Sequence, residues 1–267
     1  MNPVFRVVAR ANESFLTDVD RRSPGPYPLT IVGWHRVDAA PGGLSTTPEE
    51  LRRHLDLLED WRVLPLDEAV RRLHDRTLPR RAVALTFDDG YASVGEVAWP
   101  LLRERGLPAT LYAVSGFLDG TKAFPWDGAD APPLLSAGAL RDLAADGMAV
   151  GAHSVTHRWL PHLPPEEVRR EVTGCKHALE DLLGRAVRSF AYPMGGWTKP
   201  VVEAVRGAGY AHAVTVDRGR NAVRQDPLRL YRSFAPRDVT ELRGVLAGAY
   251  TFLRPLDRWR TRNGPAF

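Results

Sequence analysis

The chain has 267 residues, of which 44% are hydrophobic and 25% are charged, so it can bury a core of ordinary globular size. Its formal net charge is +4, and no run of basic residues is longer than two. Nucleic-acid binders concentrate positive charge on one face or tail. The dispersed arginines therefore argue against a nucleic-acid partner and favour a solvated surface.

The sequence shows no targeting or membrane signal. No apolar run approaches the roughly 20 residues of a membrane-spanning helix, and Arg6, Arg10 and Glu13 interrupt the stretch where a signal peptide needs an apolar core. We expect no transmembrane segment and, by default, a cytoplasmic protein, with export left open. Cys175 is the single cysteine. It falls among apolar residues of a predicted helix, so we expect a buried structural thiol.

Beyond residue 28, strand-like and helix-like segments alternate along the chain. Residues 1–28 contain Pro24, Pro26 and Pro28 and little periodicity, so we predict an N-terminal arm followed by one domain over residues 29–267. The predicted elements, in chain order, are strand 29–34, helices 47–60 and 66–74, strand 82–87, helix 93–105, strand 109–114, helix 136–147, strand 148–152, helix 164–183, strand 187–192, helix 198–208, strand 211–216, strand 230–234 and helix 239–249.

Terminal signals and connection lengths indicate the fold class. Thr47 and Glu50 form a capping box with Pro48 at the first helical position, and Gly184 suits a left-handed helix end. Strands that alternate with helices across short connections predict an α/β fold with a parallel sheet. Roughly seven strands favour closure of that sheet into a barrel.

Three polar clusters follow predicted strands. Asp88, Asp89 and Gly90 come after strand 82–87, residues 153–157 (HSVTH) after strand 148–152, and residues 193–197 (PMGGW) after strand 187–192. In parallel α/β folds, functional groups gather at these carboxyl ends of strands. Each cluster alone is more often a simple turn, but their occurrence at three strand ends favours a shared site.

The residue types of the three clusters suit metal-assisted hydrolysis. One carboxylate and two imidazoles make a three-ligand site with open positions, and two histidines four residues apart face the same way if the segment turns helically. A second aspartate can act as base. The Pro-Met-Gly-Gly turn can direct a backbone N–H at an oxyanion.

The motifs TFDDG, HSxxH and YPxGG together resemble those of the polysaccharide deacetylases, the NodB-homology or carbohydrate esterase family 4 domains, over residues 29–234. The resemblance implies a distorted seven-stranded (β/α) barrel, a single domain and removal of N-acetyl groups from N-acetylglucosamine units. It also implies a divalent metal, usually Zn²⁺, with Co²⁺ or Ni²⁺ as alternatives. The roles implied are Asp88 as general base, Asp89, His153 and His157 as metal ligands, and the Met194 backbone N–H in the oxyanion hole.

Two features depart from the family pattern. Many members carry an arginine at the position of Ala191 that orients the base, and a late Leu-x-His motif that gives the general acid; both are missing. Trp34-His35 resembles a pair in the exopolysaccharide-deacetylase branch, so we hypothesise that His35 is the general acid; the alternative is that it only hydrogen-bonds a loop. Arg232 could replace the missing arginine by holding Asp88, or it could be an ordinary ion-pair residue.

Three residues are candidates for the substrate side of the site: Trp126, Trp197 and Arg232. Pyranose faces pack on indole rings, although a packing role is equally consistent with Trp126. Trp197 flanks the proposed oxyanion turn, and we expect Trp159 only to pack. Alternative functions are an O-acetyl esterase, a hydrolase of small cyclic amides, a non-catalytic carbohydrate-binding protein, and a structural protein whose metal holds loops. Polymer identity and oligomeric state are not indicated.

Overall fold

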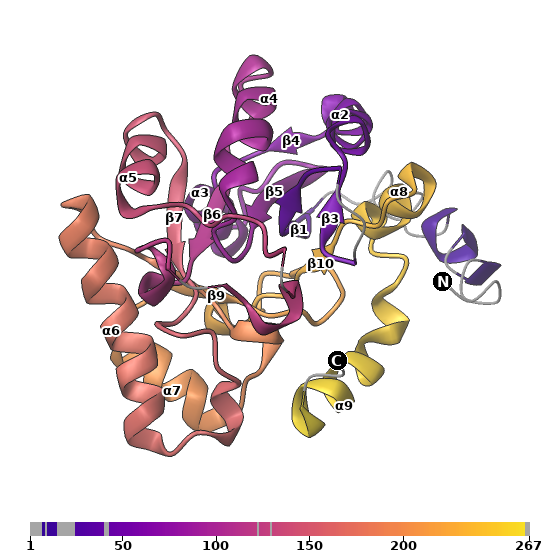
Figure 1. The fold of residues 1–267 in the computed structure, drawn as a ribbon. Coiled ribbons are helices and arrows are strands. Elements are labelled where there is room, and N and C mark those ends of the chain that lie inside the picture. Colours follow the sequence, from indigo (N-terminus) through magenta and orange to yellow (C-terminus); the bar gives the residue numbers. More distant parts are fainter. Residues whose placement is uncertain are drawn as a thin grey trace.

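The computed structural model describes residues 7, 8, 10–14, 25–39, 43–121, 123–128 and 130–264. Part of the predicted N-terminal arm therefore lies outside the described residues. Residues 7, 8 and 10–14 are helical and lie beside α8 (Val239–Ala247) at the edge of the molecule (Figure 1). The Asn12 side-chain amide donates to the carbonyl of Ala249 at 3.2 Å, so this segment contacts the domain.

A curved parallel sheet forms the centre of the molecule (Figure 1). Its seven main strands run in the order β10-β1-β5-β6-β7-β8-β9, and β4 pairs with β5. The sheet curls into a half-barrel, which confirms the predicted barrel-like α/β fold. The strands are β1 Thr30–Trp34, β4 Arg62–Val63, β5 Ala82–Phe87, β6 Thr110–Ala113, β7 Ala149–Ala152, β8 Ser189–Ala191, β9 His212–Val214 and β10 Ser233–Phe234, and a separate pair is β2 Arg36–Val37 with β3 Ser45–Thr46.

The seven main strands are those predicted from the sequence. Strand 82–87 forms as β5 without change, and the others are a few residues shorter. Every residue of β1 and β5 is buried, as expected for parallel strands covered on both faces. The bridge between Val214 and Leu230 brings the chain before β10 against β9, while β10 itself pairs with β1. Residues 230–234 therefore reach both ends of the curved sheet.

Helices cover the outer side of the sheet (Figure 1). Both predicted terminal signals are confirmed: Thr47 and Glu50 make the capping box, and Gly184 takes a left-handed conformation. The predicted helix 93–105 forms as a π-helical turn, Val94–Ala98, that leads into α4. The helices are α2 Pro48–Leu57, α3 Leu66–His74, α4 Trp99–Glu104, α5 Ala137–Ala145, α6 Pro165–Leu183, α7 Lys199–Gly207, α8 and α9 Arg254–Asn263.

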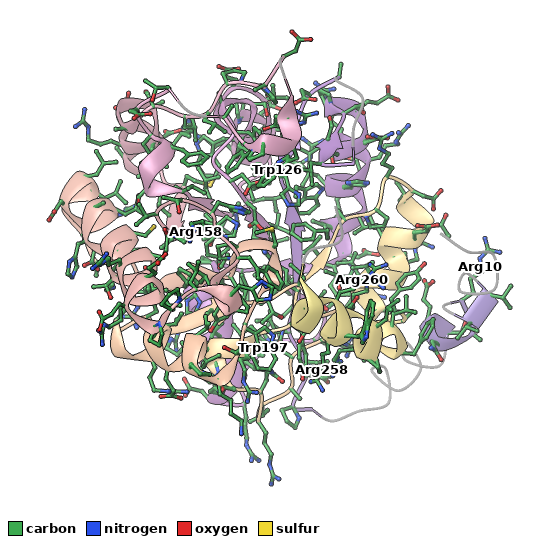
Figure 2. All side chains as sticks on the ribbon, turned by 60° about the horizontal axis from the view of Figure 1, so that its bottom comes forward. Arg10, Trp126, Arg158, Trp197, Arg258 and Arg260 are labelled. Atoms are coloured by element: carbon green, nitrogen blue, oxygen red, sulfur yellow. The ribbon has the colours of Figure 1, made fainter. Side chains whose placement is uncertain are left out.

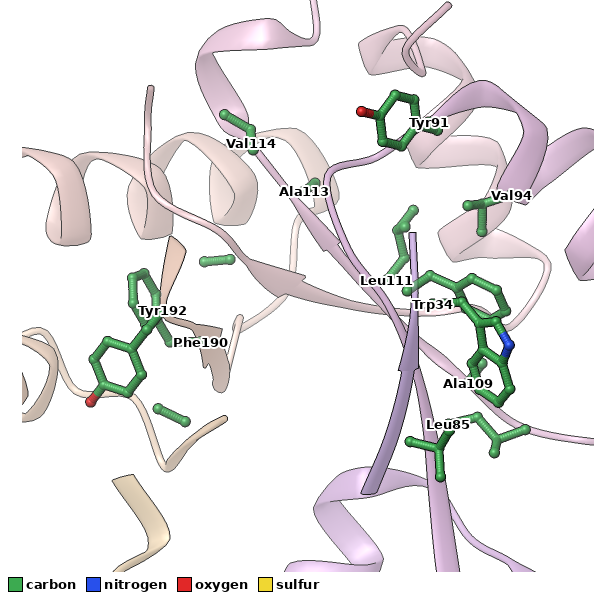
Figure 3. Close-up of a cluster of buried hydrophobic side chains, with 14 of the residues drawn as sticks. Trp34, Leu85, Tyr91, Val94, Ala109, Leu111, Ala113, Val114, Phe190 and Tyr192 are labelled. Atoms are coloured by element: carbon green, nitrogen blue, oxygen red, sulfur yellow. The ribbon is translucent and has the colours of Figure 1, made fainter. Parts of the chain in front are cut away.

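Apolar side chains fill the space between the outer side of the sheet and the helices that cover it (Figure 3). Trp34 stacks on Phe87 with ring centroids 5.5 Å apart, and its indole N–H donates to His54 Nδ1 at 3.3 Å. Close packing explains the glycine at position 33, because a Cβ there would lie 2.9 Å from the Phe234 ring. The glycine therefore allows Phe234 to come close to β1, just before His35.

The structure also tests the predictions for the single cysteine and for membrane-spanning helices. Cys175 is fully buried, as predicted, and its thiol lies 3.7 Å from the carbonyl of Ala113. Within the described residues, no helix combines the length and hydropathy needed to cross a membrane.

Candidate metal centre and pocket

Asp89, His153 and His157 converge at the carboxyl ends of β5 and β7. One potential ligand atom from each residue lies within 4.8 Å of the other two. Asp89 Oδ1 is 3.5 Å from His153 Nε2 and 3.3 Å from His157 Nε2. All three side chains are buried. The sequence-predicted ligands are thus brought together.

The donor set fits a divalent cation. Asp89 Oδ1 is buried and has no hydrogen-bond partner among the described residues. A buried polar atom left unpaired is costly, and a cation beside two imidazoles would satisfy this one. One carboxylate with two imidazoles suits Zn²⁺, and also Co²⁺ or Ni²⁺.

The ring of His153 is fixed by a backbone contact. Its Nδ1 lies 2.8 Å from the carbonyl oxygen of Ala191, which can only accept. Nδ1 therefore carries a hydrogen, and in the neutral ring the lone pair of Nε2 faces Asp89. This arrangement of a second contact behind a histidine ligand is typical of metal sites.

The segment 153–157 is not a helical turn, so the expected reason for the convergence of the two histidines is wrong. Ser154 and His157 have φ values of 63° and 58°, in the left-handed region. The Ser154 hydroxyl accepts the N–H of His157 at 2.9 Å and closes the loop. The two imidazoles therefore converge from a non-helical loop that two left-handed residues and the Ser154 contact shape.

Glu171 holds the same loop from α6 and was not identified from the sequence. Its carboxylate accepts the backbone N–H groups of Val155 at 2.9 Å and Thr156 at 2.8 Å, and the Thr156 hydroxyl at 2.5 Å. A signal was present, because Glu171 lies on the buried stripe of α6 between Val168 and Val172. A carboxylate on an apolar helix face needs partners, and here the partners are the loop amides.

Backbone strain concentrates at the site. Among the described non-glycine residues, positive φ occurs at six positions, and four of them are Asp89, Ser154, His157 and Met194. Such conformations persist only when the surroundings enforce them, and they cluster at functional sites.

Asp88 is paired with Arg232. The guanidinium donates from Nη1 and Nη2 to the two carboxylate oxygens, each at 2.6 Å, and from Nη1 to the Thr86 hydroxyl at 3.2 Å. The contacts required for Arg232 to hold Asp88 are therefore present. Arg232 is fully buried and does not line the pocket, so grouping it with residues that touch substrate is incorrect.

Charges in the site favour an ionised carboxylate pair and a neutral His157. Burial opposes ionisation of Asp88, but Arg232 and His153 lower its pKa below the ordinary value. Burial likewise opposes ionisation of Asp89, and His153 and His157 outweigh it to lower its pKa. Burial lowers the pKa of His157 to about 4. An ionised carboxylate and a neutral imidazole are the forms that bind metal.

The pKa values of His153 and His35 are shifted in opposite directions. Burial alone would lower the pKa of His153, but the carboxylates of Asp89 and Asp88 raise it. Burial lowers the pKa of His35 despite the same two carboxylates. The His35 ring stacks on Phe234 with centroids 4.3 Å apart.

These groups open into a pocket of about 740 Å³. His35 and Met194, both predicted from the sequence, line it beside the aspartates and histidines. Trp126 also lines it, and its ring meets the edge of His157 at a centroid distance of 5.1 Å. Met194 belongs to the 3₁₀ turn Pro193–Gly195.

Trp197 does not line the pocket, contrary to expectation. Its ring faces Arg229, with the guanidinium carbon 5.2 Å from the ring centroid, and Figure 2 shows it well apart from Trp126. Trp159, expected only to pack, lines the pocket instead. It lies so close to Gly196 that a Cβ there would be 2.7 Å from its ring. Trp159 therefore lies against the turn that follows Met194.

Comparison with protein families gives one match over the centre of the chain. Residues 75–213 match the family described as polysaccharide deacetylase. The Bacillus subtilis (strain 168) protein YxkH, named for this family, is 23% identical over 210 residues, which are 78% of this chain and 71% of that protein.

Two other relatives have shorter matches. A chitooligosaccharide deacetylase of Bradyrhizobium sp. (strain ANU 289) is 30% identical over 54% of this chain and 59% of its own length. The poly-beta-1,6-N-acetyl-D-glucosamine N-deacetylase of Escherichia coli (strain K12) is 30% identical over 42% of this chain. That match spans only 18% of the Escherichia coli protein.

Solved structures share the fold. IcaB from Ammonifex degensii superposes with a TM-score of 0.72 at 24% identity, covering 84% of this chain and 98% of that one. The Streptococcus pyogenes deacetylase PplD gives a TM-score of 0.71 at 23% identity, covering 80% and 95%.

Proposed function

Because the chain belongs to the polysaccharide deacetylase family, we propose that it hydrolyses the acetamide of an N-acetylglucosamine-containing glycan or glycoconjugate. The observation that carries the proposal is the convergence of Asp89, His153 and His157 beside the separately held carboxylate of Asp88. The names of two relatives, which act on chitooligosaccharide and on poly-N-acetylglucosamine, support this substrate class.

Asp89, His153 and His157 would hold the divalent ion, with Zn²⁺ the first choice. When bound, such an ion supplies Lewis acidity, which activates water and polarises a carbonyl. The support for these ligands is the unpaired Asp89 oxygen and the two Nε2 atoms that face it.

Asp88 would be the general base. It takes a proton from the attacking water as the water oxygen bonds to the acetamide carbon. Arg232 occupies both oxygens of Asp88 from behind and keeps the carboxylate ionised and oriented. The Met194 backbone N–H would donate to the carbonyl oxygen as negative charge develops on it. The left-handed conformation of Met194 at the pocket wall supports this role.

His35 would be the general acid. Cleavage of the C–N bond releases acetate and leaves the sugar nitrogen in need of a proton, which His35 would donate. Its place in the pocket with Asp88 and Asp89 supports this assignment. Trp126, on the His157 side, would pack against the pyranose face.

We also propose that the catalytic domain comprises residues 29–267. The support is that residues of α8, α9 and the connection between them line the same pocket as Asp88 and His153.

An acetate-release assay tests the function. The substrates are chito-oligomers, poly-N-acetylglucosamine fragments and acetylated xylan, each with chelator, with added Zn²⁺ and with added Co²⁺. We expect metal-dependent release from the N-acetylated substrates, none from xylan, and none from Asp88→Asn. Release from xylan alone would favour an O-acetyl esterase. Absence of acetate release by the metal-loaded protein from every N-acetylated sugar, polymer or conjugate would contradict the proposal.

A further inference from the structure

The wall of the pocket that the C-terminal helices form carries a group of apolar side chains, unlike the side that holds the candidate metal ligands. Its members include the apolar residues Val245, Tyr250, Leu253 and Leu256, which come from α8, α9 and the chain between them. Leu256 is 40% exposed, whereas the other three are nearly buried. A sugar needs partners for its hydroxyl groups, and these four side chains offer only the Tyr250 hydroxyl.

Hydrogen bonds and ion pairs hold α9 against the rest of the domain, so this wall of the pocket has a defined position. The buried carboxylate of Asp257 accepts the backbone N–H of Arg218 at 3.0 Å and lies 3.4 Å from its guanidinium. Arg254 donates to the carbonyl of Arg218 at 2.9 Å, and Arg258 donates to the Tyr231 hydroxyl at 3.1 Å. Four arginine and aspartate side chains thus connect α9 to the loop after β9 and to the chain before β10.

Two arginines stand at the same wall. Arg218 and Arg260 both line the pocket, and Arg260 is exposed on α9 (Figure 2). Arg218 shares the carboxylate of Asp257, whereas Arg260 has no ion pair within 4.0 Å among the described residues. Two cations against one carboxylate leave this part of the pocket positively charged, and an arginine is well suited to bind a phosphate oxygen.

We propose that the substrate is an amphiphile: an N-acetylated amino sugar joined through a phosphate to a lipid chain. This rests on the proposed deacetylase function. The sugar lies at the metal side under Trp126, the phosphate lies at Arg218 and Arg260, and the chain packs along Leu253 and Leu256. An uncharged polysaccharide in the same place would set hydroxyl groups against the apolar wall and would give Arg218 and Arg260 no anionic partner besides Asp257.

Binding is measured first, on the metal-free protein, by calorimetry below the micelle concentration of each ligand. The probes are N-acetylglucosamine 1-(decyl phosphate), decyl N-acetylglucosaminide without phosphate, and N-acetylglucosamine 1-phosphate without a chain. We expect the first to bind at least on the order of tenfold tighter than either of the others. In an alkyl series the affinity should rise about three- to fourfold for each added methylene.

Two variants of exposed residues separate the phosphate contact from the chain contact. Arg260→Gln should remove about tenfold of the preference for the phosphate and leave the chain-length series unchanged. Leu256→Ser should flatten the chain-length series and leave the phosphate preference unchanged. Arg169→Gln, on the outer face of α6 where its side chain is 60% exposed, is the matched control and should change neither.

Acetate release from the same probes by the metal-loaded protein distinguishes the proposed deacetylase function from the proposed amphiphilic ligand. Equal binding of all three probes, or an Arg260→Gln variant that binds like wild type, would overturn the amphiphile, even if chito-oligomers are deacetylated. Preferential binding that depends on Arg260 and Leu256, with no acetate released from any substrate, would sustain the amphiphile as ligand and remove the deacetylase function.

Discussion

The guanidinium of Arg232 and the carboxylate of Asp88 form a buried ion pair with two hydrogen bonds, each 2.6 Å long, between residues 144 positions apart in the chain. Arg232 comes just before β10 and Asp88 comes just after β5. These two strands are the neighbours of β1 in the sheet. The pair therefore depends on the pairing of β10 and β5 with the two edges of β1. Ala191 offers no side chain for this pairing, and its carbonyl instead accepts from His153 Nδ1 at 2.8 Å.

Replacing Arg232 should destabilise the protein as well as inactivate it. Arg232→Met leaves Asp88 charged, buried and unpaired, which costs about 3–5 kcal/mol. We expect a matching loss in the free energy of unfolding, measured with denaturant, and loss of acetate release. The double variant Arg232→Met/Asp88→Asn should recover much of the stability but none of the activity. A single variant as stable as wild type would contradict this account of the pair.

Glu171 should matter for metal binding without touching the metal. Glu171→Gln can keep one oxygen on the two loop N–H groups, but it replaces the acceptor of the Thr156 hydroxyl with an NH₂ donor and removes the negative charge, so the loop that carries His157 is held less firmly. We expect the affinity for Zn²⁺ to fall about 10- to 100-fold, as for other residues that orient metal ligands. A competition titration with a chromophoric chelator measures it.

The matched control is Glu167→Gln on the same helix. Glu167 pairs with Arg158 at the surface, and 38% of its side chain is exposed. The Glu167→Gln variant should bind Zn²⁺ with the same affinity as wild type. Equal affinities for the two variants would show that Glu171 does not position the loop.

The sequence predicts the seven main strands, most helices and the three residues of the candidate metal site, because each has a local signal. β5 is a fully buried and mainly apolar run, and two adjacent aspartates follow it directly. The helix α9 escaped prediction because arginine and aspartate dominate it and leave no apolar periodicity. The two-residue strands β2, β3 and β4 are too short to carry a pattern of their own.

Relationships between distant segments explain the errors in the site. Trp197 and Trp159 both follow a motif closely, but Trp159 packs on Gly196 and lines the pocket, whereas Trp197 packs on Arg229 outside it. The loop from His153 to His157 has the spacing of a helical turn, but the buried Glu171 carboxylate stabilises a different backbone path. Neither fact is encoded within a short window of sequence.

The general-acid role of His35 can be tested through the leaving group. His35→Gln should lower kcat/KM on an acetamide substrate about 100-fold or more, because the departing amine needs a proton. An activated aryl acetate needs no such proton and should be hydrolysed at close to the wild-type rate. His177→Gln, exposed on α6, should leave both rates unchanged. A His35 variant with wild-type activity on the acetamide would remove the assignment.

Cys175 should be unreactive in the folded protein. Burial raises the pKa of its thiol to about 11 from an ordinary value of 9.0. Its neutral form is favoured by folding, so the associated stability is complete below pH 9.0 and is lost as the pH rises toward about 11. We expect no reaction with a thiol reagent at pH 8 until denaturant is added. Cys175→Ala should lose less stability than wild type between those two pH values, and rapid labelling of the native protein would contradict the burial.

Trp126 and Trp197 should differ in their effect on substrate binding. Trp126 lines the pocket and contacts His157, and its indole N–H donates to the Tyr91 hydroxyl at 3.3 Å, which fixes the ring. We expect Trp126→Ala to raise KM for an N-acetylated glycan about tenfold, in line with the loss of a stacking contact of about 1 kcal/mol and its buried area. Trp197→Ala removes a ring that packs outside the pocket, so it should lower thermal stability while KM stays within about twofold of wild type. Steady-state kinetics on the two variants, at matched metal loading, measures both values. If Trp197→Ala raises KM and Trp126→Ala does not, the sugar binds on the other side of the Met194 turn.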